Sequence, residues 1–394
     1  MFSQHFLPRW AQVLEWEKSA PDYADAQTLS DTRAPALFIR SLWRGDFGTG
    51  STFDRQVSRL AAAQKESRFA SRLYGIVPLY VTSICSERCI YCNYRADNKG
   101  KDITRLRLRP SQLEKEAQFL VGEKNLRVIE LVYATDPKRR VDGICRDVEL
   151  TKQILEEHGG GMVGINAEAF EANEYQRLIT AGIDFAVLWQ ETYDPGRYGF
   201  LHPGATKKTK FFFRMDAYER MLDGGLKRFG MGVLSGLSDW RRDWAMLISH
   251  EAYLTEHYGI GPSILGIPRL KPVAGASFKY SAFTPSRDQF TSAVALHNLF
   301  APDVLPFVNT REDWKTCLEL VRGGGALFTF NCSTIPGGYS LGVSGMQFPT
   351  NSFDVAVASA SVQSAGYESV LDWTFDDLLC PPISSGCRLQ ESDA

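Results

Sequence analysis

Short apolar runs alternate with helical patterns along most of the chain, and this rhythm constrains the fold more than any other feature. Each run is short enough to be a buried strand, and most gaps between runs carry the apolar spacing of a helix. Eight strand–helix units favour an α/β fold with a closed (β/α)8 TIM-type barrel over an open doubly wound sheet. The predicted strands are residues 76–84, 127–133, 162–166, 185–190, 229–234, 264–267, 304–308 and 326–330.

The sequence on either side of this pattern predicts two smaller parts. Residues 1–70 have apolar residues at helical spacing and predict an N-terminal helical extension packed outside the barrel. The barrel is assigned to residues 71–347. Residues 348–394 begin with one helical pattern and end in a short polar tail rich in Pro, Ser and Gly. With 394 residues, of which 44% are apolar, the chain can bury a large core.

Three cysteines follow the first predicted strand in the spacing C-x3-C-x2-C, as Cys85, Cys89 and Cys92. Thiolates at this density suit an iron–sulfur cluster, and three of them leave one iron of a 4Fe-4S cluster open for another ligand. A structural zinc site would need four ligands, and the next Cys or His downstream are Cys145 and His158. The cluster is the favoured interpretation, with a zinc-binding or inert cysteine set as the alternative.

Polar residues also follow the next three predicted strands. Asp136 follows the second strand, where it can hydrogen-bond a ribose diol or cap the turn before Pro137, and the sequence leaves both readings open. The third strand ends at Asn166 and the fourth in Gln190 and Glu191. Because active sites of such barrels form at the C-terminal ends of the strands, these side chains are candidates for a shared site.

Cationic residues follow the later strands. The lysine run at residues 207–210 predicts a solvated face, whereas Arg214 opens a helix from which it can reach a carboxylate. Arg269 and Arg311 follow the sixth and seventh strands. Together they can bind the carboxylate of an amino acid at the barrel mouth, or they can form structural salt bridges. For Arg311 the ligand-binding role is favoured.

Charge and cysteine usage exclude several other functions. The net charge of −2 gives no broad basic surface, so nucleic-acid binding is not expected. No apolar run approaches the ~20 residues that cross a bilayer, and the first residues lack an apolar signal region. The remaining cysteines are scattered, which predicts a reducing, cytoplasmic location. Cys380 and Cys387 suggest a second metal site only weakly, and ordinary thiols are favoured there.

A set of motifs in collinear order narrows the prediction. Between about residues 74 and 340 the chain carries VPLYxxxxCxxxCxYC, QETY, GVLSGLSD, PRLKP, TRE and PGGY. This order resembles the aromatic amino acid lyases of the radical S-adenosylmethionine (SAM) superfamily, most of all the thiamine-pathway tyrosine lyases, or 2-iminoacetate synthases. The tryptophan lyases that form 3-methyl-2-indolic acid and the hydrogenase-maturation tyrosine lyases are related. The resemblance implies a 4Fe-4S cluster and S-adenosyl-L-methionine as cofactors.

The resemblance also implies an activity and partners. A 5'-deoxyadenosyl radical would cleave the Cα–Cβ bond of L-tyrosine, giving 2-iminoacetate (dehydroglycine) and p-cresol. Reduced ferredoxin or flavodoxin would supply the electron, and a thiazole synthase would receive the product. The alternatives are a lyase for tryptophan or another amino acid, and a non-catalytic iron–sulfur or zinc-binding barrel. A hydrolytic barrel is disfavoured, because the histidines show no grouping at strand ends.

Roles for single residues follow from their places in the matched motifs. Cys85, Cys89 and Cys92 would hold the cluster. Residues implied to line SAM are Tyr91, Asp136, Asn166, Gln190, Glu191 and Arg214. The resemblance also implies that Arg311 binds the carboxylate of the substrate and that Tyr80 and Ser333 lie near the substrate.

Two departures from the family pattern bear on the SAM pocket and on the substrate. The Thr-Gly-Glu segment of the family is Ala134-Thr135-Asp136 here, and Asn93 stands where glycine is usual.

Overall fold

Parallel strands close into a barrel, which confirms the predicted fold class. The computed structural model describes residues 1–19, 24–43, 47–100, 103–266, 268–308, 310–351 and 354–378. Within them the strand order is β2-β3-β4-β5-β6-β7-β8-β1-β9, and β1 also pairs with β2, which closes the ring of eight. The strands are β1 (Arg72–Thr82), β2 (Val128–Tyr133), β3 (Met162–Asn166), β4 (Phe185–Val187), β5 (Phe229–Gly232), β6 (Ile264–Gly266), β7 (Leu305–Val308), β8 (Leu327–Thr329) and β9 (Glu368–Val370).

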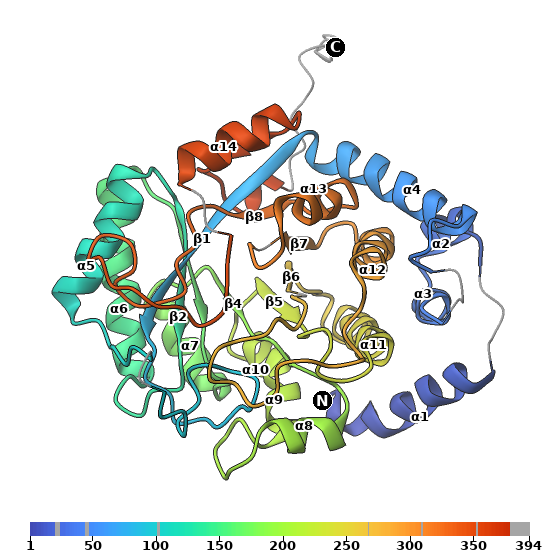
Figure 1. The fold of residues 1–394 in the computed structure, drawn as a ribbon, viewed down its shortest axis with the longest axis horizontal. Helices are drawn as coiled ribbons and strands as arrows, with labels where there is room; N and C mark the ends of the chain where they lie inside the picture. The colour runs from blue at the N-terminus through green and yellow to red at the C-terminus, as the bar shows by residue number, and fades with distance from the viewer. Residues whose placement is uncertain are drawn as a thin grey trace, which may run out of the picture.

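Helices surround the barrel (Figure 1), and most of them follow a strand as the periodicity predicts. They are α5 (Pro110–Gln118), which continues into the π-helical turn η1 (Phe119–Glu123), α6 (Val141–Glu157), α7 (Ala172–Thr180), α8 (Pro195–Leu201), α9 (Phe211–Met215), α10 (Ala217–Asp223), α11 (Trp240–Tyr258), α12 (Arg287–Phe300), α13 (Trp314–Arg322) and α14 (Val355–Ser364), with a 3-10 turn η2 (Asp376–Leu378).

In the described part of the N-terminal region, four helices precede the barrel, namely α1 (Ser3–Ser19), α2 (Ala26–Thr32), α3 (Pro35–Ser41) and α4 (Thr52–Phe69). They pack on the outer helices: α1 and α3 lie against α11, and α4 lies against α12. The backbone N–H of Phe2 donates to the buried carboxylate of Glu219 on α10, which fixes the start of the chain.

The C-terminal segment forms more structure than the predicted helix and loop. Strand β9 pairs with the start of β1. After it, Trp373 and Phe375 pack with the inward side chains at the N-terminal ends of the strands, and Trp373 Nε1 donates a 2.8 Å hydrogen bond to the carbonyl of Gly75. This segment therefore closes the bottom of the barrel. Cys380 and Cys387 lie outside the described residues.

Strand register decides which side chains face into the barrel. Successive side chains of a strand alternate between its two faces. Pro78 and Tyr80 on β1 lie opposite Glu130 and Val132 on β2, so these four share the inner face. On the far side, glycines make room for a large ring: a Cβ at Gly266 would lie 2.2 Å from the indole of Trp189.

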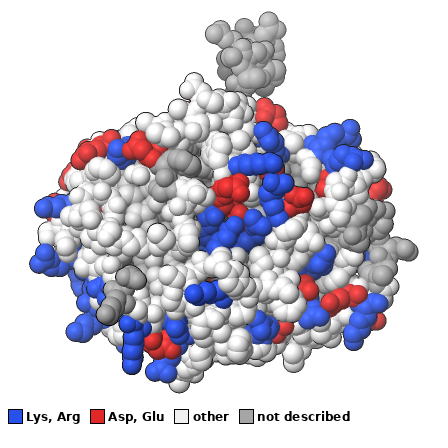
Figure 2. All heavy atoms as spheres, in the orientation of Figure 1, with Lys and Arg blue, Asp and Glu red and all other residues white. Residues whose placement is uncertain are grey.

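The surface mixes charges of both signs, as the near-neutral net charge predicts. Figure 2 shows basic side chains gathered near the centre of one face, with acidic ones beside them. In the part of the chain that the structure describes, no helix has the length and apolarity to span a membrane.

Candidate active site

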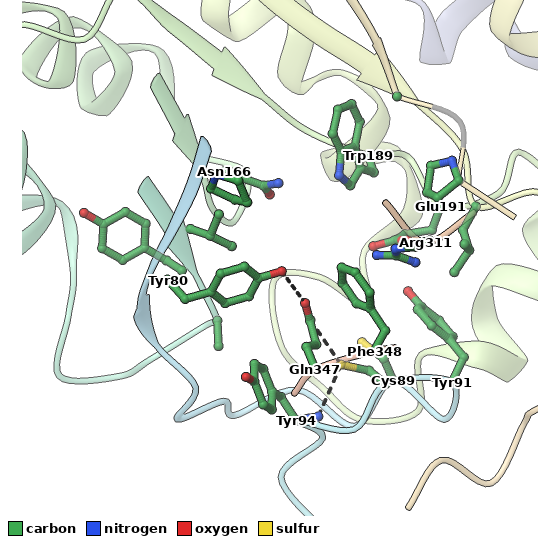
Figure 3. A pocket seen from close by; sticks show the side chains of 18 of the residues that line it. Tyr80, Cys89, Tyr91, Tyr94, Asn166, Trp189, Glu191, Arg311, Gln347 and Phe348 are labelled. Carbon is green, nitrogen blue, oxygen red and sulfur yellow. Dashed lines mark hydrogen bonds between the residues drawn. The ribbon is translucent and has the colours of Figure 1, made fainter. Parts of the chain in front are cut away.

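A cavity opens at the C-terminal ends of the barrel strands, where the fold predicts it (Figure 3). It brings together nine of the twelve predicted site residues. These are Tyr80, Cys85, Cys89, Tyr91, Cys92, Asn166, Glu191, Arg214 and Arg311. The other three predicted residues, which do not line it, are Asp136, Gln190 and Ser333.

The cysteine loop forms one wall of this cavity. Cys85, Cys89 and Cys92 all line it, and each is a free thiol. Burial raises the pKa of Cys85 to about 11 and that of Cys89 to about 12. Neither thiol ionises near neutral pH by itself, so a bound cationic centre is needed to draw out the thiolates.

The donors on this wall fit an iron–sulfur cluster better than a single ion. Among the described residues, no three Cys, His, Asp or Glu side chains are grouped so that they could hold a metal ion. A 4Fe-4S cluster takes its cysteines on separate irons and does not need them to converge on one point. Backbone N–H groups also point at the sulfurs, as that of Glu87 does at Cys85 Sγ (3.4 Å) and that of Tyr94 at Cys92 Sγ (3.4 Å).

A buried ion-pair cluster lies on the wall formed after β4. Glu191 accepts a 2.8 Å hydrogen bond from Lys208 Nζ, and the Arg214 guanidinium lies 3.6 Å from the same oxygen. Burial raises the pKa of Glu191, but Lys208 and Arg214 lower it by more, which brings the value down to about 2. Arg214 is held in turn by a 2.8 Å hydrogen bond to the carbonyl of Trp189.

The prediction that the lysine run is a solvated face is wrong for Lys208. The Lys208 side chain is only 16% exposed, whereas that of Lys207 is 48% exposed. Burial lowers the pKa of Lys208, but nearby anionic groups, Glu191 among them, raise it by more, so the ammonium stays charged in the cavity. The sequence carried no signal for this, because adjacent lysines look alike until the loop folds.

Tyr91 lies beside this cluster and is fixed through His202. His202 Nδ1 is 2.8 Å from the carbonyl of Tyr198, which can only accept, so the ring proton lies on Nδ1. Burial lowers the pKa of His202 to about 3, and the neutral ring accepts at Nε2 from the Tyr91 hydroxyl at 2.8 Å.

The two arginines that were expected at the mouth take different roles. Arg269 forms a two-point ion pair with the buried carboxylate of Glu312, which Lys271 also contacts at 2.8 Å. Of the two alternatives, a ligand contact or a structural salt bridge, Arg269 therefore forms the structural salt bridge. Arg311 lines the cavity, with its guanidinium carbon 3.3 Å from the centre of the Phe348 ring, and lies next to Glu191 in Figure 3.

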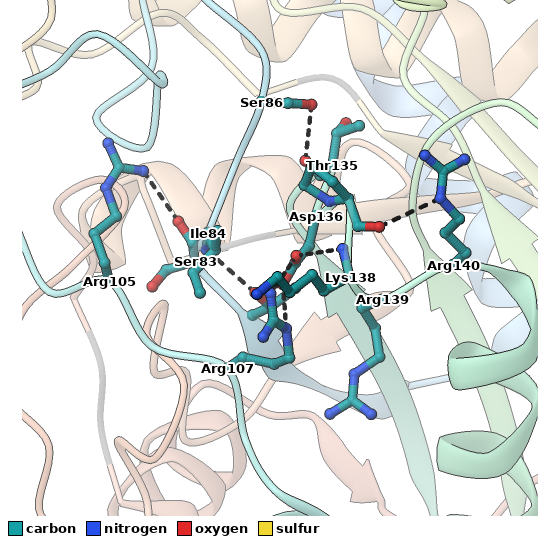
Figure 4. Close-up of polar contacts among 12 residues, drawn as sticks. Ser83, Ile84, Ser86, Arg105, Arg107, Thr135, Asp136, Lys138, Arg139 and Arg140 are labelled. Atoms are coloured by element: carbon teal, nitrogen blue, oxygen red, sulfur yellow. Dashed lines mark hydrogen bonds and ion pairs between the residues drawn. The ribbon is translucent and has the colours of Figure 1, made fainter.

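Asp136 is turned away from the cavity and is fully engaged (Figure 4). Its carboxylate accepts two hydrogen bonds from the guanidinium of Arg107, one from the Thr82 hydroxyl and one from the backbone N–H of Lys138. The bond to Lys138 is the turn-capping alternative named from the sequence. The geometry does not favour a ribose contact, because the side chain has no exposed surface.

Gln190 and Ser333 also lie off the cavity. Gln190 is buried, and neither atom of its side-chain amide finds a hydrogen-bond partner in the described structure. The Ser333 hydroxyl packs so closely on Gly338 that a Cβ there would lie 2.0 Å from it.

Sequence reasoning also missed side chains that the fold brings to the cavity. Gln347 and Phe348 come from the segment after β8, which carried no strand or helix signal. Glu130 did leave a signal: an acid in the middle of the apolar run Val128–Tyr133 breaks the pattern of a buried strand.

Comparison with known proteins shows which enzymes the chain is similar to. No family model matches the chain. The 2-iminoacetate synthase of Escherichia coli is 26% identical over 350 residues, which cover 85% of this chain and 87% of that protein. The chain is similar over most of its length to the radical SAM aromatic amino acid lyase family. It is a radical SAM lyase that uses a 4Fe-4S cluster and S-adenosyl-L-methionine, acts on a small molecule and needs a reductant.

Solved structures share the fold of this radical SAM lyase. The FeFe-hydrogenase maturase HydG has a TM-score of 0.83 and 23% identity, over 92% of this chain and 80% of HydG. Methylornithine synthase (PylB) has a TM-score of 0.67 and 18% identity, over 90% of this chain and 98% of that one.

Proposed function

We propose that this radical SAM lyase cleaves the Cα–Cβ bond of L-tyrosine and releases 2-iminoacetate and p-cresol. The observation that carries the proposal is the convergence of Arg311, Tyr80 and the three cluster cysteines on one cavity. The similarity to 2-iminoacetate synthase over most of both chains supports the same reaction.

The cofactors have a suitable place in this cavity. Cys85, Cys89 and Cys92 would hold the cluster, and Tyr91 and Glu191 would bind SAM. The cluster and SAM supply, when bound, a 5'-deoxyadenosyl radical that takes a hydrogen atom from the amino group of the substrate. Glu191 has a φ of 73°, in a region that costs a non-glycine residue energy, which indicates that this position is closely constrained.

The substrate would lie on the opposite side of the cavity. Arg311 would bind its carboxylate, because a guanidinium is the natural two-point partner of a carboxylate. Phe348 stacks on that guanidinium and fixes its orientation. Holding the amino group at a fixed distance from the radical carbon is the main contribution the protein can make.

Tyr80 would lie beside the substrate. Burial raises the pKa of its phenol well above the usual value, so it stays a neutral donor, and it donates a 2.8 Å hydrogen bond to Gln347. Asn166 lines the same cavity as a further polar contact. Asp136, Gln190 and Ser333 are left out of the proposed site because they do not line the cavity.

The proposed pathway is that of thiamine biosynthesis. A reduced ferredoxin or flavodoxin would be the electron donor, and a thiazole synthase would be the acceptor of 2-iminoacetate. The support is the name of the E. coli relative and the reactivity of the product, an imine that hydrolyses in water and is best handed on directly.

An anaerobic assay tests the proposal. Reconstituted protein is incubated with SAM, dithionite and one aromatic amino acid at a time, and the products are read by mass spectrometry. Deoxyadenosine and p-cresol from tyrosine are the expected products. If tryptophan gives deoxyadenosine and 3-methyl-2-indolic acid, tryptophan and not tyrosine is the substrate. If neither amino acid gives a fragment although deoxyadenosine forms, both are excluded as substrates.

A further inference from the structure

A carboxylic acid lies on the inner wall of the barrel, at the floor of the candidate active site. Glu130 is on the inner face of β2, opposite Pro78 of β1 and Gly164 of β3. It is 2% exposed and lines the cavity. Among the described residues only Asn166 donates a hydrogen bond to it, at 2.8 Å from Oε1.

Nothing in the fold calls for an acid here. Burial raises the pKa of Glu130 to about 7 and Asn166 lowers it by less, and no cation in the described structure is among the causes that act on it. A buried carboxyl with one hydrogen bond is costly, and an apolar side chain of similar size would pack without that cost. Groups kept at such a cost inside a cavity are candidates for ligand binding.

A second polar group on the same floor also lacks a partner. Thr329, at the end of β8, is 2% exposed and lines the cavity, and no described residue is within hydrogen-bond reach of its Oγ1. Strands β8 and β2 both pair with β1, so Thr329 and Glu130 lie on either side of it. The floor is therefore polar on two strands, whereas the rings of Trp189 and Phe307 supply apolar lining elsewhere in the cavity.

Arg311, the predicted partner of the substrate carboxylate, lines the same cavity as the floor residues Glu130 and Thr329. Both the Arg311 guanidinium and the Glu130 carboxylate act on Tyr80: after burial, Arg311 lowers the pKa of its phenol and Glu130 raises it. The same two charges act in the same directions on the thiol of Cys332. Arg311, Tyr80 and Glu130 line the same cavity, so a ligand bound to Arg311 would share its space with Glu130.

We propose that Glu130 determines substrate specificity by accepting a hydrogen bond from a donor group at the far end of the substrate's side chain. The inference rests on the proposed function, in that the ligand is an amino acid bound through Arg311. The amino acids that fit this role share a hydrogen-bond donor at the end of the side chain, such as the hydroxyl of tyrosine or the ammonium of lysine. Thr329 offers a second contact to the same group.

Binding to the non-reduced holoenzyme tests this without turnover. Cluster-reconstituted protein with SAM and no reductant is titrated by calorimetry with tyrosine, phenylalanine and lysine. The proteins compared are the wild type, Glu130→Gln, which keeps the size and an acceptor oxygen, and Glu130→Leu. The control is Glu168→Gln, since Glu168 lines the same cavity but lies on the loop after β3.

Wild type is expected to bind a ligand with the distal donor on the order of 100-fold more tightly than phenylalanine, because an unmatched buried acceptor is costly. Glu130→Leu is expected to reduce this ratio to about one, Glu130→Gln to an intermediate value, and Glu168→Gln to leave it unchanged. An unchanged ratio in both Glu130 variants, in protein that retains its cluster and folded spectrum, overturns the inference.

The outcomes separate this inference from the proposed function. Tyrosine cleavage by wild type, with tyrosine-over-phenylalanine selectivity that is equal in wild type and the Glu130 variants, removes the inference and leaves the function. Glu130-dependent binding of lysine, with no cleavage of tyrosine, supports the inference and removes tyrosine as the substrate.

Discussion

Gln347 and Cys92 are joined by a hydrogen bond from Nε2 of the amide to Sγ of the thiol, at 3.6 Å. The same amide accepts at Oε1 from the phenol of Tyr80 (Figure 3). One side chain thus connects a predicted substrate contact to a predicted cluster ligand. Because hydrogen bonds to cluster sulfurs set the reduction potential, this amide is expected to tune the cluster.

Replacing Gln347 with Leu should make the cluster harder to reduce, because the thiolate of Cys92 loses a donor that stabilises added negative charge. The midpoint potential should become more negative, by tens of millivolts or about 1 kcal/mol. A redox titration followed by electron paramagnetic resonance measures it. Gln347→Glu, which keeps the shape and loses the donor, should behave similarly. An unmoved potential in both variants would contradict the tuning role.

Lys208→Met should weaken SAM binding. Glu191 would lose its 2.8 Å partner, and Arg214 is farther away at 3.6 Å, so a buried negative charge would be left partly uncompensated. The dissociation constant for SAM should rise by about 10- to 100-fold, equivalent to about 1.4–2.7 kcal/mol. Equilibrium dialysis with reconstituted protein measures it. Lys207→Met is the matched control, because that side chain is half exposed and lies 3.9 Å from Glu174.

Arg311→Ala should separate SAM cleavage from product formation. The cluster and reductive cleavage of SAM should persist, whereas turnover of tyrosine should fall on the order of 100-fold or more, since loss of a buried carboxylate partner costs about 2–5 kcal/mol. The ratio of deoxyadenosine to p-cresol measures the uncoupling. A normal yield of p-cresol would rule out Arg311 as the carboxylate clamp.

Arg269→Ala should instead act on stability. Its removal leaves the buried carboxylate of Glu312 with Lys271 alone, which is expected to cost about 3 kcal/mol or more in the free energy of unfolding. Denaturant titration measures this cost. If the Arg269→Ala protein is stable but fails to bind substrate, then Arg269 binds the substrate and its assignment as a structural residue is wrong.

Glu130 should make the protein less stable as the pH rises. Its folded-state pKa of about 7 is above the ordinary value of 4.5, so the folded state holds the proton longer. Stability is lost between about pH 4.5 and 7, and Glu130→Gln should be more stable than wild type by about 1–3 kcal/mol at pH 8 and similar at pH 4. Tyr80, Cys332 and Tyr339 interact with this charge and stay protonated there, since burial raises the pKa of each. Urea titrations at both pH values, compared as differences between the two proteins, test this.

Asp136→Asn should destabilise the protein rather than remove a SAM contact. The two-point pair with Arg107 would be broken, which is expected to cost about 2–4 kcal/mol, while the SAM dissociation constant should change little. Denaturation and SAM binding of one preparation give both numbers. If stability is unchanged and the affinity for SAM falls strongly, Asp136 contacts the ribose of SAM after all.

The sequence by itself determined the barrel and its catalytic end. Periodicity located all eight barrel strands, because a buried strand needs a continuous apolar run. The predicted ends of the fourth and fifth strands were too long: β4 ends at Val187 and β5 at Gly232, and beyond them Glu191 and Val233 form only an isolated bridge. The cysteine spacing predicted the loop that lines the cavity with three thiols, since those cysteines are close together in the chain.

Tertiary structure alone decided which polar side chain meets which. Lys208 reaches Glu191 across 17 positions, Arg269 reaches Glu312 across 43, and Tyr80 reaches Gln347 across 267. Local sequence patterns cannot predict such pairs. A charged side chain is buried only when a distant segment supplies its partner in a region that excludes water. For the same reason Lys208 could not be told from Lys207 until the strands had closed.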